Sequence, residues 1–62
     1  MAAGHYRFYL QRDGQTFPAE VLQCDNDSNA VEKAKELLAL SMTFRLMEVW
    51  QGYRKVGIVE RG

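Results

Sequence analysis

The residues with the most reactive side chains are His5 and Cys24, and two carboxylates, Asp25 and Asp27, closely follow the cysteine. A structural zinc site needs four ligands in a tetrahedron, which one histidine and one cysteine do not complete. The acidic residues lack the spacing and the terminal glutamate of a calcium-binding EF-hand loop. We therefore predict no metal site and no cofactor, and we interpret the carboxylates as capping groups of a helix.

A nucleophilic cysteine would need a base beside its sulfur and a third group that orients the base. His5 is the candidate base, but the expected strand pairing puts it opposite Leu22, out of step with Cys24. No orienting group is evident in the sequence. The glycine of Asp13-Gly14 is typical of a hairpin turn and not of a phosphate-binding loop. We therefore predict no catalytic residue and no enzymatic activity.

The chain is short and electrically neutral. Its 62 residues form one predicted domain, residues 1–62, near the lower size limit for folding without disulfides, a metal or oligomerisation. A single cysteine cannot form an intramolecular disulfide, so oligomerisation is the expected aid. Eight basic and eight acidic residues cancel, without the basic excess of most nucleic-acid binders. The sequence has neither a membrane-spanning run nor a signal-peptide pattern, so we expect a cytoplasmic protein.

Residues 27–41 have a clear helical period, with charged side chains on one side of the helical wheel and an apolar stripe on the other. The residues of the stripe are Ala30, Val31, Ala34, Leu37, Leu38 and Ser41. One apolar stripe indicates one buried face, so the rest of the chain must supply the surface on which the helix packs. We expect Leu37 and Leu38 both to be buried between helix and sheet.

The start of this helix is marked by residues 25–29, all of which can cap a helix. Asp27 or Ser28 is the expected cap. Asn29 with Glu32 has the spacing of a capping box, an alternative that would shorten the helix. No glycine marks the other end, and we expect the helix to fray near residues 40–41.

Residues 5–11 alternate between apolar and polar side chains, which predicts a half-buried strand. Asp13-Gly14 favours a type I′ turn, because both residues tolerate positive φ. The resulting register pairs Arg12 with Gln15, Leu10 with Phe17, Tyr9 with Pro18, Phe8 with Ala19, Arg7 with Glu20 and Tyr6 with Val21. Pro18 cannot donate to the ladder, so the second strand is expected at a sheet edge. Leu22 and Cys24 then point away from the helix, unless a bulge or an early exit of the chain brings them under it.

Residues 44–50 alternate again, and Gly52-Tyr53 suits a type II′ turn. The register pairs Gln51 with Arg54, Trp50 with Lys55, Val49 with Val56 and Met47 with Ile58. Those last four residues form one apolar face, and the other face carries Leu46, Trp50 and Val59. Two hairpins and one helix predict an α+β fold, ββαββ, with a four-stranded antiparallel sheet and the helix packed on one face. The sequence leaves the strand order open.

Three stretches carry a family resemblance: HYRFYLQRDG at residues 5–14, CDNDSNA at residues 24–30 with the helix that follows, and MEVWQG at residues 47–52. In them the chain resembles a group of short, mostly alphaproteobacterial proteins with a domain of unknown function. The resemblance implies the fold alone, because the group has no activity or site to carry over. Its members usually lack the FPAEVLQ of residues 17–23, which leaves the path of the second strand open.

The predicted function is association with another protein through the sheet face that the helix does not cover. A small monomer rarely exposes a continuous apolar patch, and tryptophan and tyrosine often carry interface energy. The predicted interface residues are Trp50, Leu46, Val59, Phe44 and Tyr9. We predict a homodimer, or a module that docks on a larger protein and regulates or inhibits it, and we expect no small-molecule substrate.

Single-stranded nucleic-acid binding is the alternative. Tyr9, Trp50 and Tyr53 could stack bases on an exposed sheet face, beside basic side chains that contact phosphates. The basic side chains in question are Arg7, Arg54 and Lys55. Zero net charge weighs against this alternative, as do Glu20 and Glu48, which are predicted on the same face.

Overall fold

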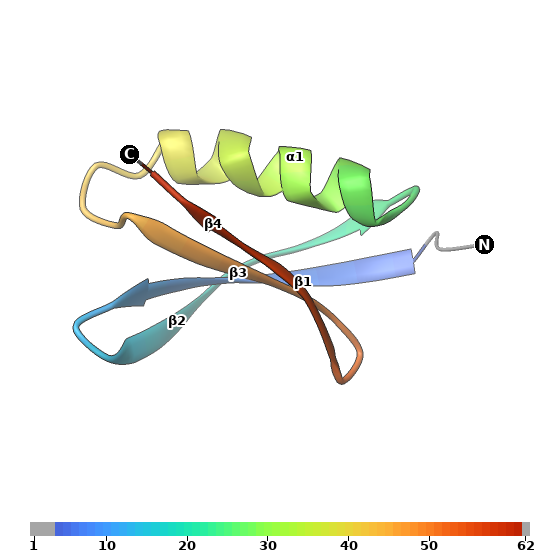
Figure 1. Ribbon diagram of the computed structural model, residues 1–62, viewed down its shortest axis with the longest axis horizontal. Coiled ribbons are helices and arrows are strands. Elements are labelled where there is room, and N and C mark those ends of the chain that lie inside the picture. The colour runs from blue at the N-terminus through green and yellow to red at the C-terminus, as the bar shows by residue number, and fades with distance from the viewer. Residues whose placement is uncertain (1–3, 62) are drawn as a thin grey trace.

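A computed structural model describes residues 4–61 of the chain as four strands and one helix. In chain order the elements are β1 (Gly4–Arg12), β2 (Gln15–Cys24), α1 (Asp27–Ala39), β3 (Leu46–Gln51) and β4 (Arg54–Glu60). The strands form one antiparallel sheet in the order β2-β1-β3-β4, and α1 lies across one face of it (Figure 1). This arrangement confirms the predicted ββαββ fold. Within the described residues, no helix has the length and apolar character to cross a membrane.

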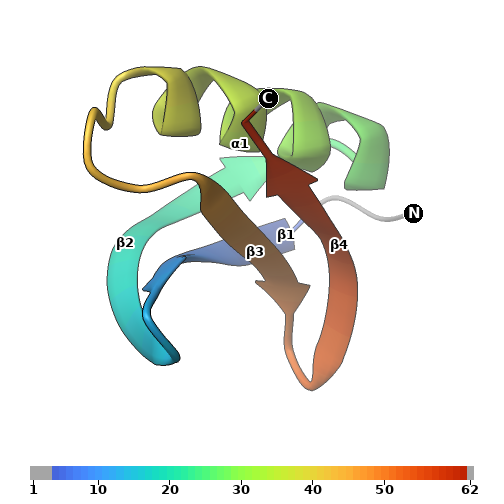
Figure 2. The same ribbon diagram turned by 60° about the vertical axis from the view of Figure 1, so that its left-hand side comes forward.

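The sheet is strongly twisted, so that β2 and β4 curve toward α1 at one end and away from it at their turns (Figure 2). β1 and β3 occupy the centre of the sheet, and β2 and β4 are its edges. The edge position of β2 confirms the prediction made from Pro18, whose nitrogen cannot donate to a neighbouring strand.

The N-cap lies before both predicted caps, one residue ahead of Asp27 and two ahead of Ser28. Asn26 is the N-cap, and its side-chain oxygen accepts a hydrogen bond from the backbone N–H of Asn29 at 2.8 Å. The capping-box alternative is therefore also wrong, since Asn29 is itself inside the helix. α1 ends at Ala39, as the expected fraying near residues 40–41 requires. The guanidinium of Arg61 donates to the carbonyl of Leu38 at 3.3 Å, in addition to the bond that this carbonyl accepts from the backbone N–H of Ser41 at 3.0 Å.

The core lies between α1 and the sheet. Its largest fully buried side chains are Tyr6, Phe8, Leu38, Met47 and Val49. Ala30 and Ala34 are buried as well, and their small side chains let the helix approach the strands closely. The buried line of the helix thus runs through Ala30, Ala34 and Leu38, at intervals of four residues. Leu37 lies beside this line and is only partly buried, which corrects the prediction that it is buried as fully as Leu38.

The edge strand β2 contains a bulge. Tyr9 still pairs with Pro18, but Phe8 pairs with Glu20, so Ala19 is an extra residue. The predicted pairs of Phe8 with Ala19, Arg7 with Glu20 and Tyr6 with Val21 are therefore wrong. The bulge alternative is confirmed, because Leu22 and Cys24 turn under the helix and Val21 turns outward with 60% of its surface exposed.

The other edge strand, β4, has a matching irregularity. Trp50 pairs with Lys55 as predicted, but Val49 pairs with Gly57, so Val56 is the extra residue. The predicted pairs of Val49 with Val56 and Met47 with Ile58 are wrong. Val59 consequently turns into the core with 9% of its surface exposed, and Ile58 turns outward with 52% exposed.

The two hairpin turns agree with their predicted types. Asp13 and Gly14 both have positive φ, 53° and 76°, as a type I′ turn requires. Gly52 has a φ of 61°, and Tyr53, which follows it, does not share the positive φ, as expected when glycine comes first in a type II′ turn.

Candidate functional site

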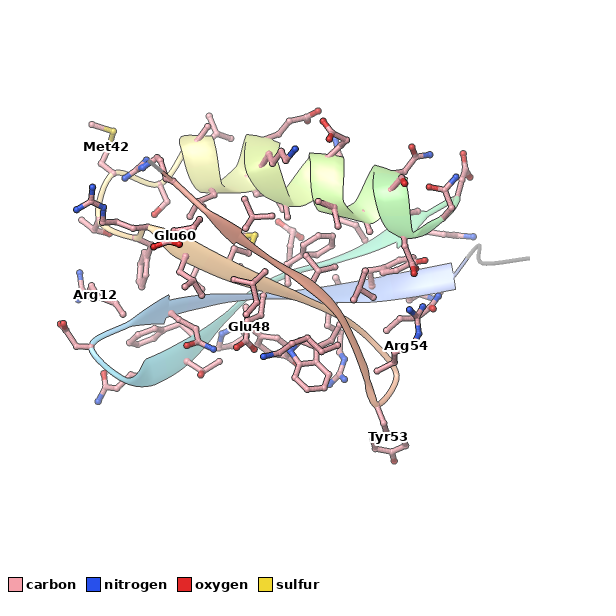
Figure 3. All side chains as sticks on the ribbon, viewed as in Figure 1. Arg12, Met42, Glu48, Tyr53, Arg54 and Glu60 are labelled. Atoms are coloured by element: carbon pink, nitrogen blue, oxygen red, sulfur yellow. The ribbon has the colours of Figure 1, made fainter. Side chains whose placement is uncertain are left out.

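The sheet face away from α1, which we call the open face, presents three rows of side chains. Residues paired across antiparallel strands point to the same side of a sheet, so the pairing defines the rows. The rows are Val21, Arg7, Trp50 and Lys55; Pro18, Tyr9, Glu48 and Ile58; and Thr16, Gln11, Leu46 and Glu60. No helix or strand of the described chain covers them, and Figure 3 shows Glu48 on the side of the sheet opposite α1.

Glu48 lies at the centre of the open face and binds three neighbours. Its carboxylate accepts a hydrogen bond from the indole N–H of Trp50 at 2.9 Å and one from the side-chain amide of Gln11. The ammonium of Lys55 lies 3.3 Å from the same carboxylate. Only 13% of the Glu48 side chain is exposed. The hydrogen bond from Trp50 is the main cause that lowers the pKa of Glu48, against the opposing effect of burial, so the group is a stable anion and not a proton donor near neutral pH.

The two basic side chains of the open face also have partners within the chain. Arg7 donates to the hydroxyl of Tyr9 at 2.8 Å and to the carbonyl of Gly52, and its guanidinium lies 5.6 Å from the centre of the Tyr9 ring. The Lys55 ammonium lies 5.7 Å from the centre of the Trp50 ring. The cations and aromatic rings of this face are therefore already in contact with one another.

The predicted interface residues fall into two groups. Trp50, Leu46 and Tyr9 lie on the open face, where each is partly buried by its neighbours. Phe44 instead packs against the core, with its ring edge-to-face on Phe17 at a centroid distance of 5.5 Å. Val59 is a core residue, so its predicted position on the open face is wrong.

Sequence reasoning missed Ile58 and Val21, which bring exposed apolar surface to the two edges of the open face. Regular strands would put both residues on the helix side, and the bulges in β2 and β4 turn them to the open face. One weak signal existed, since a glycine inside a strand often marks a bulge and Gly57 directly follows the extra residue of β4. In β2 the signals are Pro18, which directly precedes the extra residue, and the phase of Leu22 and Cys24, which a regular strand would point away from the helix.

A second cluster lies on the helix side of the sheet, around Asp27. Its carboxylate accepts a hydrogen bond from the hydroxyl of Tyr6 at 2.8 Å and two from the guanidinium of Arg54 at 2.9 and 3.0 Å. The bonds from Arg54 are the main cause that lowers the pKa of Asp27 to about 2, and the Tyr6 hydroxyl adds to them. The cluster joins the first turn of α1 to β1 and β4, so its chemistry is used in holding the fold together.

His5 and Cys24, the two candidate ligands considered in the sequence, lie apart. Cys24 pairs with Gly4 and is buried under the helix, whereas His5 pairs with Gln23 and is exposed on the opposite face. Burial is the main cause that raises the pKa of the Cys24 thiol, which keeps it protonated and poorly nucleophilic. Among residues 4–61, no three histidine, cysteine, aspartate or glutamate side chains come together in a way that could hold a metal ion.

Comparisons of the chain with protein-family models, with curated proteins and with solved structures found no match. The resemblance to short bacterial proteins therefore stays a prediction. The features of the molecule that bear on function are the geometry and charge of the open face.

Proposed function

We propose that the protein is a non-enzymatic interaction module that forms a homodimer through the open face of its sheet. The observation that carries the proposal is the carboxylate of Glu48, which is held by Gln11, Trp50 and Lys55 on a face without a covering element. Burying a charged group is costly unless it is paired and hydrogen-bonded. Here the pairing exists before a partner arrives, so the face can lose its water at a reduced cost.

Apolar side chains supply the gain. Trp50, Leu46 and Ile58 lie on neighbouring strands of the open face, and Tyr9 lies among them. Large aromatic side chains near the centre of a surface are the residues that most often carry binding energy. Covering them stabilises the folded chain through its partner, which matters for a domain of this size.

A second copy of the chain is an adequate partner in area. A standard protein interface buries about 800 Å² on each side, which is about a fifth of the 4268 Å² surface of this chain. One face of a four-stranded sheet, with its rim, can provide that area. A larger protein that the module regulates or inhibits is the other partner considered, and the test below distinguishes the two.

Single-stranded nucleic acid is the second candidate, because Tyr9 and Trp50 share the open face with Arg7 and Lys55. Two observations weigh against it. Arg7 and Lys55 already contact Tyr9 and Trp50, and the Glu48 anion is a direct neighbour of both rings. A titration with oligonucleotides at two salt concentrations tests this candidate, since phosphate contacts weaken steeply as salt rises.

Analytical ultracentrifugation of the pure chain, from low to high micromolar concentration, tests the homodimer. We expect a reversible dimer, and we expect Ile58→Lys to shift it to monomer while leaving the circular dichroism spectrum unchanged. Lysine suits this position in the folded monomer, because Glu48 is the cross-strand neighbour of Ile58. Met42→Lys is the matched control, since Met42 is 86% exposed in the loop after α1.

A wild-type chain that stays monomeric at high micromolar concentration would rule out self-association. A larger protein would then be the partner to seek for the open face. Such a partner should bind the Met42→Lys variant and should not bind the Ile58→Lys variant.

A further inference from the structure

We infer that the two copies pack open face on open face about a twofold axis that runs across the strands, with Lys55 of each copy facing Glu60 of the other. This inference rests on the proposed homodimer and specifies its geometry. It follows from the shape of the sheet and from the positions of charged and apolar side chains in the three rows of the open face.

The twist of the sheet limits the possible arrangements. Strands that rotate steadily across a sheet give each face the shape of a saddle, as Figure 2 shows for this sheet. A half-turn about an axis in the plane of the sheet, either along the strands or across them, returns such a saddle to its own shape. A second copy turned about one of these axes therefore matches the open face in shape, with the strand directions within about 30° of each other.

An axis along the strands exchanges the inner strands with each other and the outer strands with each other. Lys55 would then lie over Val21 of the second copy, and Glu60 over Thr16. Lys55 would keep its contact with Glu48 but gain no second anion, and Glu60 would be buried without a cation, which is unfavourable.

With an axis across the strands, each strand instead lies over the same strand of the second copy. The first and third rows then face each other, and the middle row faces itself. Lys55 then faces Glu60 of the second copy, and Trp50 faces Leu46. Ile58, in the middle row, lies over Ile58 of the second copy. Because the contact is twofold, the ion pair and the apolar pair each occur twice, and opposite charges and apolar surfaces are matched.

The side chains at the two ends of β4 suit this contact. Glu60 is exposed, and across residues 4–61 no basic side chain forms an ion pair with it. Lys55 keeps 41% of its side chain exposed although it contacts Glu48, and an ammonium has three protons to donate. Glu48 meets its own copy near the axis, where the donors from Gln11, Trp50 and Lys55 offset its charge.

Charge reversal at the two sites tests the inference. Lys55→Glu and Glu60→Lys each place two like-charge contacts in the homodimer, and we expect each variant alone to associate at least about tenfold more weakly than the wild type. A mixture of the two variants should form a heterodimer, because Glu at 55 then faces Lys at 60 and Lys55 faces Glu60. Native mass spectrometry or ultracentrifugation of the mixture, with one variant labelled, measures this directly.

A matched control uses an ion pair on the exposed side of α1. Glu32 and Lys35 lie 3.1 Å apart there, away from the sheet. Glu32→Lys and Lys35→Glu carry the same charge reversals as the test variants. We expect both to dimerise like the wild type, with no preference for each other in a mixture.

Chemical crosslinking gives a second readout that does not depend on charge. Facing sheets lie about 10 Å apart, beyond the reach of a direct disulfide, so a bismaleimide with a short spacer is the probe. It should join Ile58→Cys chains into a covalent dimer, and it should not join Met42→Cys chains. Cys24 should remain unmodified, since it is buried under α1. A wild-type dimer without the heterodimer or the Ile58→Cys crosslink would overturn this axis and leave the homodimer proposal standing. A monomeric wild type would overturn both.

Discussion

On each side of the sheet one carboxylate makes three polar contacts, yet the two clusters do different work. Asp27 receives donors from Tyr6 and Arg54, and in doing so it fastens the first turn of α1 to β1 and β4. Glu48 receives donors from β1, β3 and β4, which are strands already joined in one sheet. The first cluster connects two layers of the fold. The Glu48 cluster does not connect the sheet to another layer, so we interpret it as a group of contacts that neutralises this charge for the binding of a partner.

Asp27, which holds the fold together, is the more exposed of the two carboxylates, and Glu48, on the uncovered face, is the more buried. The Asp27 side chain is 43% exposed, so water screens its interaction with Arg54. Glu48 is more buried, although no helix or strand of the described chain lies over it. Its neighbours Gln11, Trp50 and Lys55 shield it from water and bind its charge, which is the state that the proposed interface requires.

The largest expected difference between the two faces is in stability, and it comes from a substitution in the core under the helix. Leu38→Ala removes a fully buried side chain and should cost about 2–5 kcal/mol, which approaches the whole stability expected for so short a chain. We expect a largely unfolded protein by circular dichroism. Leu40→Ala is the control, because Leu40 lies just past the helix and is 81% exposed. Equal losses from the two variants would mean that the helix is docked in a different rotation.

On the open face, Trp50→Glu should affect association before it affects folding. It places a negative charge beside Glu48 and removes a central aromatic side chain, so we expect the dimer to weaken by at least about 30-fold. The melting temperature of this variant should no longer rise with protein concentration, whereas that of the wild type should. A Trp50→Glu dimer as stable as the wild type would remove the open face from consideration as the interface.

A substitution in the turn between β1 and β2 should destabilise the sheet without changing a side chain on either face. Gly14→Val should cost more than about 1 kcal/mol, because Gly14 has a φ of 76° and a β-branched residue is strained there. A new side chain would meet no other atom at this position, so the cost comes from the backbone alone. Gly14→Asn, which tolerates positive φ, should retain most of the stability in a thermal melt.

The smallest expected effect is the pH dependence of stability that each of the two carboxylates contributes. The folded-state pKa of Asp27 is about 2, below its ordinary value of 3.8, so its contribution to stability is present above pH about 4 and is lost as the pH falls toward 2. We expect Asp27→Asn to remove this part of the acid sensitivity. Glu48 has the same sign, because its pKa is also lowered.

Protein concentration then distinguishes the two groups. If a second copy covers Glu48, the acid sensitivity that Glu48→Gln removes should grow with protein concentration, and the part that Asp27→Asn removes should not. Melting curves measured between pH about 2 and 5 at two concentrations give both quantities. Identical concentration dependence for the two variants would end the distinction between the faces.

The local features of this fold were predictable, and the features that depend on distant contacts were not. Asp13-Gly14 identified its turn because the signal lies in two adjacent residues, and Pro18 identified an edge strand because it lacks a donor. The helical period identified the buried side of α1 but not its exact rotation, since Leu37 and Leu38 are both leucine and the sheet decides between them. The contacts among Tyr6, Asp27 and Arg54 could not be predicted, because they join three elements whose strand order the sequence left open.

The bulges in β2 and β4 explain the errors in the predicted open face. Each shifts the rest of its strand by one residue, and one residue is enough to move a side chain to the other side of a sheet. Val59 and Ile58 exchanged faces for this reason. Cys24 and Val21 depended in the same way on a bulge that the sequence of β2 allowed but did not specify.

The two strands that contain bulges, β2 and β4, are also the two edges of the sheet. This placement affects how readily the protein aggregates in concentrated solution. A straight, regular border strand offers its unpaired amides to any passing chain, which is the first step toward amyloid-like fibres. Here one border is interrupted by Pro18 and an inserted residue, and the other by an insertion beside Gly57. These interruptions break the row of unpaired amides along both borders, so growth by adding one strand after another is disfavoured.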